Sequence, residues 1–401
     1  MPSALILYHF LYPDDVVSAV HFTELCTGLQ ERGWDVVALP CNRGCRDDSK
    51  SYPPQADLDG VRIRRIWRPA FPQKKSWGRI ANTLWMLLAW SWDAFRYKPD
   101  VLIVGTDPVL SVLIALPWKW IRPSTRIAHW CFDMYPEAAI ADGLLPRDGL
   151  LTRAIRHALR AAYAQCDLFV DLGPCMAELA RQYHPALPCV TLTPWALLEP
   201  PAPLSPNIRP LCLLYSGNFG RAHAFERTLQ LARRLRNTGV SFNFSVRGNC
   251  EHILRAAVSD RDENIAFLPF APQDQLEARL AMADIHIVSL QDHWTGAVVP
   301  SKFFGALAAG RPVLFEGSED CSVARWIKQF GVGWVLSPHT GDSIVDQLLA
   351  FTRDRAPLDA LFRHCHTVYT THFARKTVLD AWDRELRSLL TKRSYFERSS
   401  R

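Results

Sequence analysis

The feature that most constrains the fold of this 401-residue chain is a repeated alternation of short apolar runs with longer amphipathic stretches. Parallel strands need a helical crossover to reach one another, so this alternation is typical of helices packed on parallel sheets. The first-half runs are ALILY (4–8), DVVAL (35–39), DVLIVG (100–105), TRIAHW (125–130) and DLFVDL (167–172). The second-half runs are LCLLYSG (211–217), FNFSVRG (242–248), NIAFLPF (264–270), DIHIVSL (284–290), RPVLFEG (311–317) and GWVLS (333–337). The sequence therefore predicts an α/β protein.

A proline-rich segment, TPWALLEPPAPLSPNIRP, separates the two series of runs. Proline lacks an amide donor and resists both helices and central strands, so we interpret this segment as a linker. The chain also exceeds the length at which one core keeps growing. We expect two doubly wound, Rossmann-like domains at 1–193 and 211–375, joined by the linker 194–210. The final segment, 376–401, is expected to be a helix with a basic tail that can cross back to the first domain.

Composition excludes several classes of protein. Apolar residues make up 48% of the chain and charged residues 21%, which is ordinary for a folded globular protein. The eleven cysteines show neither CxxC nor zinc-ligand spacing, so we expect buried reduced thiols and no metal site. The start, MPSALILYHF, is better explained as a first strand than as a signal peptide. We therefore expect a cytoplasmic protein.

Positive charge is concentrated between residues 62 and 126, which hold twelve Lys or Arg against three Asp. The same interval contains TLWMLLAWSW (83–92), which is too short to span a bilayer. Tryptophans beside basic residues are typical of a surface that contacts acidic lipids, and we predict membrane-surface contact through 62–126. A core helix with a solvated flank is the alternative. The basic residues do not form the platform of a known nucleic-acid-binding module.

The segment VVPSKFFGALAAGRPVLFEG (298–317) predicts a loop, a short helix and a buried strand, with Ser301 as N-cap and Gly310 as terminator. Lys302 would lie in the first turn of that helix. The helix dipole disfavours a cation there by roughly 0.3–1 kcal/mol. A bound oligoanion such as a nucleotide diphosphate would reverse this effect, whereas a solvated lysine is the alternative.

Other candidate binding residues follow predicted strands, because ligands of open parallel sheets bind beyond the carboxyl ends of the strands. The loop SGNFGRAH (216–223) has two glycines that let its backbone approach a phosphate, unless they only serve a tight turn. Arg247, after another strand, has the guanidinium group that phosphate oxygens prefer, although arginines are common at surfaces. The candidate set is Gly217, Asn218, Gly220, Arg221, Arg247, Phe270, Gly296, Ser301 and Lys302.

Four motifs resemble family 4 retaining glycosyltransferases of GT-B fold: PDD (13–15), FDMYPEAAIADGL (132–144), YSGNFGRAH (215–223) and VPSKFFGALAAGRPVLFEG (299–317). The resemblance covers essentially the whole chain and is strongest to the branch that builds O-antigens, capsules and exopolysaccharides. It implies two Rossmann-like domains facing across a cleft, with the acceptor on the first and a nucleotide-sugar on the second. The implied reaction is transfer of a hexose, from a UDP-sugar by default, to a hydroxyl of a lipid-linked or oligosaccharide acceptor. Retention, no bound metal and a place on the inner face of the inner membrane are also implied.

The resemblance suggests roles for several residues. Arg221, Lys302 and the amides of Gly220 and Ser301 would stabilise the departing diphosphate. On the acceptor side, Asp133 would orient or deprotonate the attacking hydroxyl, with Glu137 beside it. A capping role for Asp133 at the next helix is the alternative.

The sequence departs from the family at its pair of glutamates eight positions apart, which align with Ala297 and Gly305. Gly305 would make room for a ligand or for close packing. We consider Glu316 or Glu319 as the replacement ligand for ribose or sugar, from position alone. Loss of both glutamates favours an alternative function, a catalytically degenerate scaffold subunit. A GT-B UDP-N-acetylglucosamine epimerase is a third possibility, although few acidic residues converge.

Overall fold

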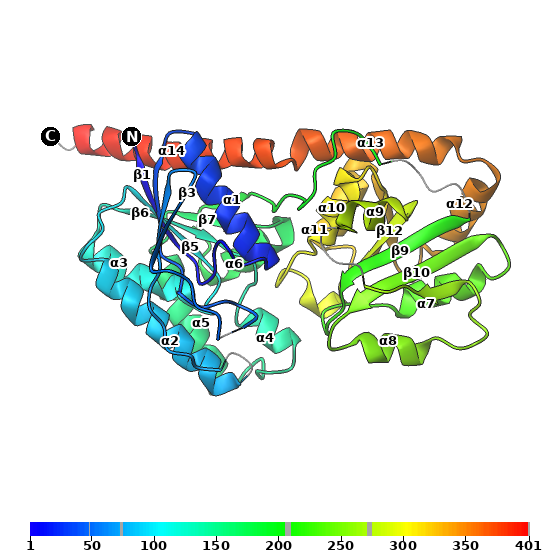
Figure 1. Cartoon of the computed structure of the whole chain (residues 1–401), viewed down its shortest axis with the longest axis horizontal. Coiled ribbons are helices and arrows are strands. Elements are labelled where there is room, and N and C mark those ends of the chain that lie inside the picture. Colours follow the sequence, from blue (N-terminus) through cyan, green and yellow to red (C-terminus); the bar gives the residue numbers. More distant parts are fainter. Residues whose placement is uncertain (48, 73–74, 205–209, 271–274, 400–401) are drawn as a thin grey trace. The chain divides into compact units, whose positions relative to one another are not determined.

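The structure is a computed structural model that describes residues 1–47, 49–72, 75–204, 210–270 and 275–399. The chain divides into two compact units (Figure 1). The first comprises Met1–Thr193 together with the residues from Leu379 onward, and the second comprises Pro194–Val378. Each unit contains its own largely parallel sheet, which confirms the predicted class of two Rossmann-like domains.

The first unit is built on an eight-stranded sheet with the order β3-β4-β2-β1-β5-β6-β7-β8. The strands are β1 (Ser3–Leu7), β2 (Asp35–Ala38), β3 (Gln55–Leu58), β4 (Val61–Arg64), β5 (Val101–Gly105), β6 (Arg126–Trp130), β7 (Leu168–Asp171) and β8 (Cys189–Thr191). The helices are α1 (Val17–Glu31), α2 (Ser76–Asp93), η1 (Ser111–Ile114), α3 (Ala115–Ile121), α4 (Glu137–Ala141), α5 (Leu150–Tyr163), α6 (Pro174–Tyr183) and α14 (Arg375–Ser399). Every paired strand is parallel except the β3–β4 pair.

The central strands of this sheet are apolar along their whole length because both of their faces are covered. All five residues of β5 are buried, as are four of the five residues of β1. Leu5 lies between Val37 and Leu102 in the register of the sheet. Such continuous apolar runs are expected of parallel strands with helices on both faces, and they made these strands predictable from the sequence.

The antiparallel hairpin β3–β4 was missed in the sequence analysis. Its two-residue turn consists of Asp59 and Gly60, which both have positive φ, at 50° and 86°. Asp-Gly between two alternating segments is a strong hairpin signal, because this turn requires two residues that tolerate positive φ. The signal was therefore present, although β3 is too polar to resemble the buried parallel strands.

The second unit is built on a six-stranded parallel sheet with the order β11-β10-β9-β12-β13-β14. The strands are β9 (Leu211–Asn218), β10 (Val240–Arg247), β11 (Ile265–Phe267), β12 (Ile285–Ser289), β13 (Val313–Glu316) and β14 (Gly333–Leu336). The helices are α7 (Glu226–Arg234), α8 (Glu251–Ala257), α9 (Leu276–Ala281), η3 (Asp292–Trp294), α10 (Lys302–Ala308), α11 (Ser322–Phe330), α12 (Gly341–Arg353) and α13 (Ala356–His372). All six predicted strands of this half are present.

The strand order creates one switch point in each sheet. In the first sheet the chain runs from β1 outward to β2 and β4, and then restarts at β5 in the opposite direction. In the second sheet it runs from β9 to β11 and restarts at β12. Right-handed crossovers place the helices of the two directions on opposite faces, which leaves a crevice at the carboxyl ends of the two central strands. Candidate sites are therefore expected beside β1 and β5, and beside β9 and β12.

The predicted linker, 194–210, is packed on the second unit over its described part. The Ala196 amide donates to the Tyr369 hydroxyl at 2.9 Å, and the Leu204 amide donates to the Ala309 carbonyl at 3.1 Å. Trp195 is buried. Residues 205–209 lie outside the described residues. The prolines thus prevent regular structure, while the flanking apolar residues anchor the segment.

The final helix, α14, returns to the first unit after Val378. Trp382 is buried, with its ring centroid 5.2 Å from that of Trp130. The Trp34 indole donates to Asp383 at 2.6 Å, and Arg32 pairs with Asp380 at 2.6 Å. An apolar contact flanked by two charged ones therefore fixes α14 on the first unit.

Replacing Trp382 with Ala should lower the free energy of unfolding by about 3–5 kcal/mol, because the substitution leaves a cavity in a buried aromatic contact. Urea unfolding followed by circular dichroism measures this change. Trp120→Ala is the matched control, since the Trp120 side chain is exposed. Equal effects of the two substitutions would contradict the docking of α14.

Candidate active site

The site of the second unit lies at the switch point between β9 and β12. Strand β9 ends at Asn218 and continues into a loop, 219–223, that we call the glycine loop. The segment after β12 holds this loop from the other side, because the Gln291 amide donates to the Ala222 carbonyl at 2.8 Å. The Gln291 side chain also donates to the His223 carbonyl at 3.3 Å. The sheet thus provides a fixed loop where ligands of this fold class bind.

Lys302, the first residue of α10, lies against the glycine loop. Its Nζ donates to the Asn218 carbonyl at 3.1 Å and to His223 Nε2 at 3.2 Å, and lies 5.1 Å from the centroid of the Tyr215 ring. Desolvation lowers the pKa of Lys302 to about 8. A lysine that is half discharged near pH 8 is held at this position by a carbonyl and an imidazole, and it gains stabilisation from any anion that binds there.

The contact between Lys302 and His223 fixes the proton on the histidine. Burial, together with the charge of Lys302, lowers the pKa of His223 to about 3, so the ring is neutral. A protonated amine only donates, so Nε2 accepts from Lys302 and Nδ1 carries the ring proton. Nδ1 then donates to the Gly220 carbonyl, 3.2 Å away. The Gly220 amide also lies 3.0 Å from the same Nδ1 and donates to it in the other tautomer, in which Nδ1 carries no proton.

Two glycines allow the loops of this site to approach closely. Gly217 has φ of +129°, and a Cβ there would lie 2.7 Å from Cε of Lys302. Gly248 has φ of +143°, and a Cβ there would lie 2.3 Å from the Phe219 carbonyl oxygen. The Phe219 amide donates to the Arg247 carbonyl at 2.7 Å. Both positions therefore combine a positive φ with a close neighbour that leaves no room for a Cβ.

The remaining predicted cations lie on neighbouring strand ends. Arg221 is exposed on the glycine loop, and Arg247 is exposed at the end of β10. The Arg247 guanidinium lies 4.2 Å from the centroid of the Phe270 ring. Gly296 has φ of +84° and lies in the turn between η3 and α10. The structure therefore brings the predicted residues to one edge of the sheet.

Ser301 precedes α10 as predicted but does not cap it with its side chain. It has helical φ and ψ of −67° and −19°, and its side chain makes no capping hydrogen bond. Ser301 therefore occupies the predicted N-cap position of α10, but the side-chain cap expected there is not formed. The helix instead begins after Pro300 with backbone hydrogen bonds that span three residues, from the Phe303 amide to the Pro300 carbonyl at 3.4 Å and from the Phe304 amide to the Ser301 carbonyl at 3.2 Å.

Glu316 is only 1% exposed and is engaged within the protein. Its carboxylate accepts hydrogen bonds from the amides of Arg227 and Thr228, both at 3.0 Å, and from the Thr228 hydroxyl at 2.6 Å. It thereby satisfies amides in the first turn of α7, where a negative charge is favourable. Glu319 is exposed and pairs with Lys328 at 2.6 Å. A contact of either carboxylate with ribose stays a prediction.

The two positions of the missing family glutamates differ in their surroundings. Ala297 is buried. A Cβ at Gly305 would have nothing within 4 Å, so open space lies beside this residue of α10. The alternative that Gly305 serves close packing is therefore wrong.

The first unit has a polar cluster at its own switch point. Nδ1 of His9, after β1, lies 3.2 Å from Oδ1 of Asp107, after β5. Burial lowers the pKa of His9, but the neighbouring Cys41 and Asp107 outweigh burial and raise it to about 9. Asp133, on the loop after β6, is accessible to solvent but lines a recess with His129 and Tyr135. Desolvation in this recess, together with the charge of Asp107, raises the pKa of Asp133 to about 6. Asp107 was not predicted, although it lies only two residues after the run DVLIVG at a strand end.

Glu137 has partners on two other helices. Oε1 accepts from Nε and Nη2 of Arg156 at 3.1 and 3.0 Å, and Oε2 accepts from the Tyr183 hydroxyl. Helix α4 begins at Glu137 after Pro136, so Asp133 is not at its capping position. The alternative capping role of Asp133 is therefore wrong, and the acceptor-side roles of Asp133 and Glu137 stay predictions.

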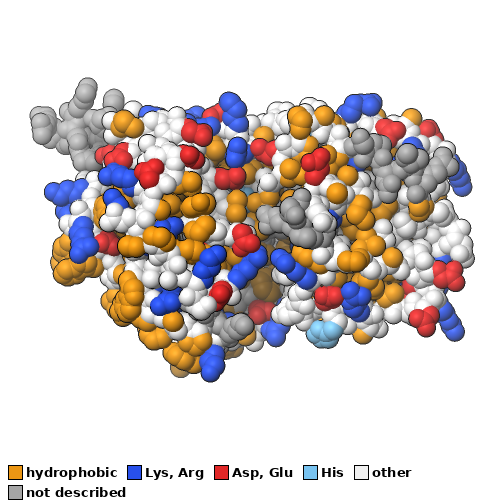
Figure 2. Space-filling model, viewed as in Figure 1, with side chains coloured by type: hydrophobic (Ala, Val, Ile, Leu, Met, Phe, Trp, Pro, Cys, Tyr) orange, Lys and Arg blue, Asp and Glu red, His pale blue; other side chains and the backbone are white. Residues whose placement is uncertain are grey.

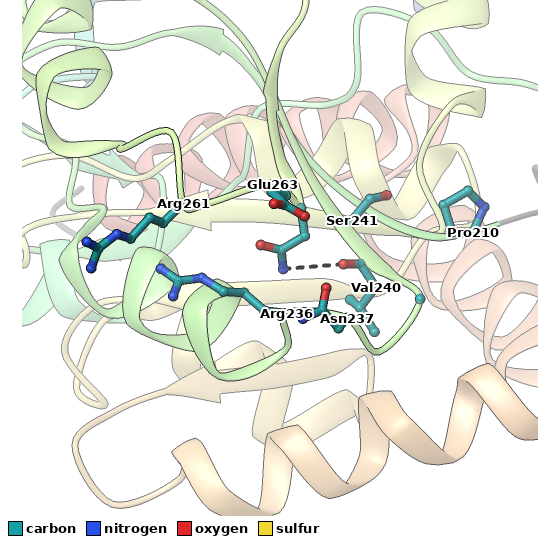
Figure 3. Close-up of a pocket in the computed structure, with 9 residues that line it drawn as sticks. Pro210, Arg236, Asn237, Val240, Ser241, Arg261 and Glu263 are labelled. Atoms are coloured by element: carbon teal, nitrogen blue, oxygen red, sulfur yellow. Dashed lines mark hydrogen bonds between the residues drawn. The ribbon is translucent and has the colours of Figure 1, made fainter.

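A separate pocket of about 370 Å³ lies at the opposite edge of the second sheet, before β10 and β11 (Figure 3). Asn264 donates to the Val240 carbonyl at 3.4 Å in its wall. Arg236 lines this pocket but is paired with Asp262. The pocket lies at the amino ends of the strands, whereas the glycine loop lies at their carboxyl ends. Among the described residues, no group of three His, Cys, Asp or Glu is placed to hold a metal ion.

Comparison with known proteins identifies the family that the first unit resembles. Residues 18–195 match the glycosyl transferase 4-like domain. The probable glycosyltransferase WbjE of Pseudomonas aeruginosa is 24% identical over 260 residues, which cover 60% of this chain and 63% of WbjE. The putative colanic acid biosynthesis glycosyl transferase WcaI of Escherichia coli K12 is 28% identical over 135 residues, or 33% of each chain. These matches thus span less than two thirds of either relative.

The fold is shared over a much longer stretch. Sucrose-phosphate synthase from Thermosynechococcus elongatus superposes with a TM-score of 0.72 at 13% identity, covering 98% of this chain and all of the synthase. The chain therefore has the GT-B fold and carries a glycosyl transferase 4-like domain. The predicted GT-B fold is confirmed, and so is the resemblance of residues 18–195 to the family 4 glycosyltransferases.

We expect Gly217→Ala and Gly305→Ala to have opposite effects on stability. Alanine at Gly217 meets positive φ and the Lys302 side chain, and should destabilise the protein by about 1–3 kcal/mol. Alanine at Gly305 enters open space in a helix and should stabilise it by about 0.5–1 kcal/mol. Denaturant unfolding measures both. Destabilisation by Gly305→Ala would contradict the open space beside α10.

Proposed function

We propose that this chain is a glycosyltransferase that moves a sugar from a nucleotide-sugar donor, with UDP as the favoured nucleotide, to an acceptor hydroxyl with retention. The acceptor is a lipid-linked or oligosaccharide intermediate of bacterial surface polysaccharide synthesis, and the reaction proceeds in the cytoplasm at the inner membrane. The observation that carries the proposal is Lys302 held on the glycine loop at the switch point of the second sheet. The matched domain and the relatives named as glycosyltransferases support it.

The second unit supplies charge for a departing diphosphate. Breaking the bond between sugar and diphosphate leaves negative charge on the leaving oxygens, and fixed donors that face this charge lower the barrier. Lys302, Arg221 and the Gly220 amide are the proposed donors. A bound diphosphate offsets the desolvation of Lys302 and keeps this lysine protonated. In this proposal these groups act without a metal.

The protonation state of Lys302 also decides whether the Gly220 amide can donate to His223. While Lys302 is charged, His223 Nδ1 carries the ring proton and does not accept from the Gly220 amide, so this amide remains available to a bound anion. When Lys302 loses its proton, Nε2 can donate to the amine, and Nδ1 can accept from the Gly220 amide, 3.0 Å away. Deprotonation therefore removes a cation and an amide donor together. We propose that His223 couples the two donors of the diphosphate site.

The remaining second-unit residues fit the rest of a nucleotide-sugar. Arg247 and Phe270 form a cation–aromatic pair on which a flat, charged ligand can pack. The open space beside Gly305 takes the place of a carboxylate side chain and leaves room for the ribose or the sugar. Glu316 holds the first turn of α7, which directly follows the glycine loop.

In the first unit, Asp133 is the proposed acceptor-side residue. At neutral pH a carboxyl with a pKa of about 6 is mainly ionised, yet basic enough to accept the proton of a hydroxyl in a strong hydrogen bond. Asp133 therefore orients the attacking hydroxyl. Asp107 keeps the pKa of Asp133 raised through its own charge. Glu137 holds α4, on which this loop ends, against Arg156 and Tyr183.

A screen of UDP-, GDP- and dTDP-sugars by thermal unfolding tests the donor site. A donor at 100 times its dissociation constant should add about 2.7 kcal/mol of stability. Lys302→Ala and Arg221→Ala should each weaken binding about 10- to 100-fold, because each removes a hydrogen bond to a charged group. Arg255→Ala is the control, since Arg255 pairs with Glu251 on α8. Wild-type binding should also weaken as pH rises through about 8.

Product analysis then separates the enzyme from the scaffold. Transfer or slow hydrolysis of the donor that binds, with loss in Lys302→Ala, is the expected result. Binding without any turnover in the presence of membrane-extracted acceptors would favour the scaffold function. Binding that is indifferent to both Lys302→Ala and Arg221→Ala would contradict the proposed donor site.

The pH dependence of kcat/KM for the acceptor tests Asp133. Activity should fall as pH decreases through about 6, because protonation removes the hydrogen-bond acceptor. In Asp107→Asn this acidic limb of the pH profile should move to lower pH, since one of the two causes of the raised Asp133 pKa is gone. Asp133→Asn should lower kcat by about 10²- to 10⁴-fold and abolish the limb, while the donor-induced thermal shift remains. An unchanged limb in Asp133→Asn would assign it to another group.

A further inference from the structure

Helix α2 presents an apolar stripe to solvent. The stripe consists of Trp77, Ile80, Leu84, Leu88 and Trp92, whose spacing of three or four residues places them on one face. Their side chains are between 55% and 71% exposed. The opposite face, which includes the buried residues Met86 and Trp90, already fills the core of the first unit. A surface helix normally has a polar outer face, so this second apolar face requires a partner.

Neighbouring segments extend the stripe. Trp67 is exposed and packs edge-on against Trp85, with ring centroids 5.4 Å apart. At the other end, Arg122 donates to the Phe95 carbonyl at 2.8 Å and holds the end of α3 beside the end of α2. Trp120, on α3, is 84% exposed. Figure 2 shows hydrophobic side chains gathered over α2 and α3, with basic side chains among them.

Only some of the basic residues in 62–126 lie next to the stripe. Several basic residues of that interval have structural partners: Arg62 pairs with Asp35, and Lys119 and Arg126 pair with Asp167. Lys74 lies outside the described residues. The exposed basic residues at the ends of α2 are Lys75 and Arg79 at its start and Arg96 and Lys98 beyond its end. Arg96 also pairs with Asp93 at 3.7 Å, and its guanidinium still faces solvent. Asp93 is the only acidic residue of the helix, and it is buried on the core side.

We propose that this face of α2 docks on a lipid bilayer that contains anionic lipids, with the helix lying in the plane of the interface. An 18-residue helix is about 27 Å long, and its apolar stripe can enter the boundary between headgroups and acyl chains. Indole rings favour this zone, and basic groups at both ends meet anionic headgroups. In the described part of the chain, no helix combines the length and hydropathy needed to cross a bilayer.

The charges select the bilayer over a second copy of the chain. Both ends of the stripe are basic, so two copies would bring like charges together in either a parallel or an antiparallel pairing. A bilayer with anionic headgroups offers opposite charge along the whole helix. The inference does not rest on the proposed transfer reaction, because neither the glycine loop nor Asp133 contributes to this surface.

Flotation of the full chain with vesicles tests the inference. Phosphatidylcholine vesicles that contain phosphatidylglycerol should bind the protein, and vesicles of phosphatidylcholine alone should bind it more weakly. Leu84→Gln/Leu88→Gln should reduce partitioning about tenfold or more, since two large side chains lose their apolar contact. Ile253→Gln/Met282→Gln is the matched control, because these residues are exposed and lie in the second unit. It should float like the wild type.

A charge variant, Lys75→Gln/Lys98→Gln, should lose about fivefold in affinity for each charge and respond less to added salt. Thermal melting checks that each variant is folded. No flotation of the wild type, or equal flotation of Leu84→Gln/Leu88→Gln and its control, would overturn the inference. A wild-type dimer in sedimentation that Leu84→Gln/Leu88→Gln abolishes would also overturn it, because a second copy would then cover the stripe.

Discussion

The contact of the Lys302 ammonium group with the end of β9 links the main features of the second unit. A lysine in the first turn of a helix is unfavourable, and desolvation adds to this cost. The Asn218 carbonyl and the His223 ring compensate only in part, as the pKa of about 8 indicates. A site that retains an incompletely compensated cation is arranged for an anion. Gly217 has to lack a side chain for this contact to form.

Loss of the two family glutamates then has a physical interpretation. At one position the side chain is a buried alanine, and at the other a glycine borders open space. Glu316, which follows the next strand, has become part of the scaffold that holds α7 after the glycine loop. The site therefore depends on cations and amides more than on carboxylates. This balance suits a ligand with concentrated negative charge, and it is why we favour a diphosphate over a neutral ligand.

Membrane docking and sugar transfer would use different surfaces of the molecule. The stripe on α2 and the cluster of His9, Asp107 and Asp133 both belong to the first unit, but they consist of different residues. A protein whose acceptor is anchored in lipid benefits from staying at the bilayer, because association in two dimensions raises the effective concentration of both partners. The two proposals support one another, although each is tested separately.

The sequence by itself determined the two parallel sheets, because runs such as DVLIVG and DIHIVSL are apolar on both faces and only buried parallel strands require that. It also identified the glycine loop and Lys302, since glycine pairs and a misplaced cation are visible without coordinates. It did not reveal Asp107, the partners of Glu316 or the outward direction of Leu84 and Leu88. Those depend on which strand ends become neighbours and which face of a helix meets the core. Contacts between residues about a hundred positions apart, such as His9 with Asp107, are set by the order of strands in the sheet, which only the tertiary structure decides.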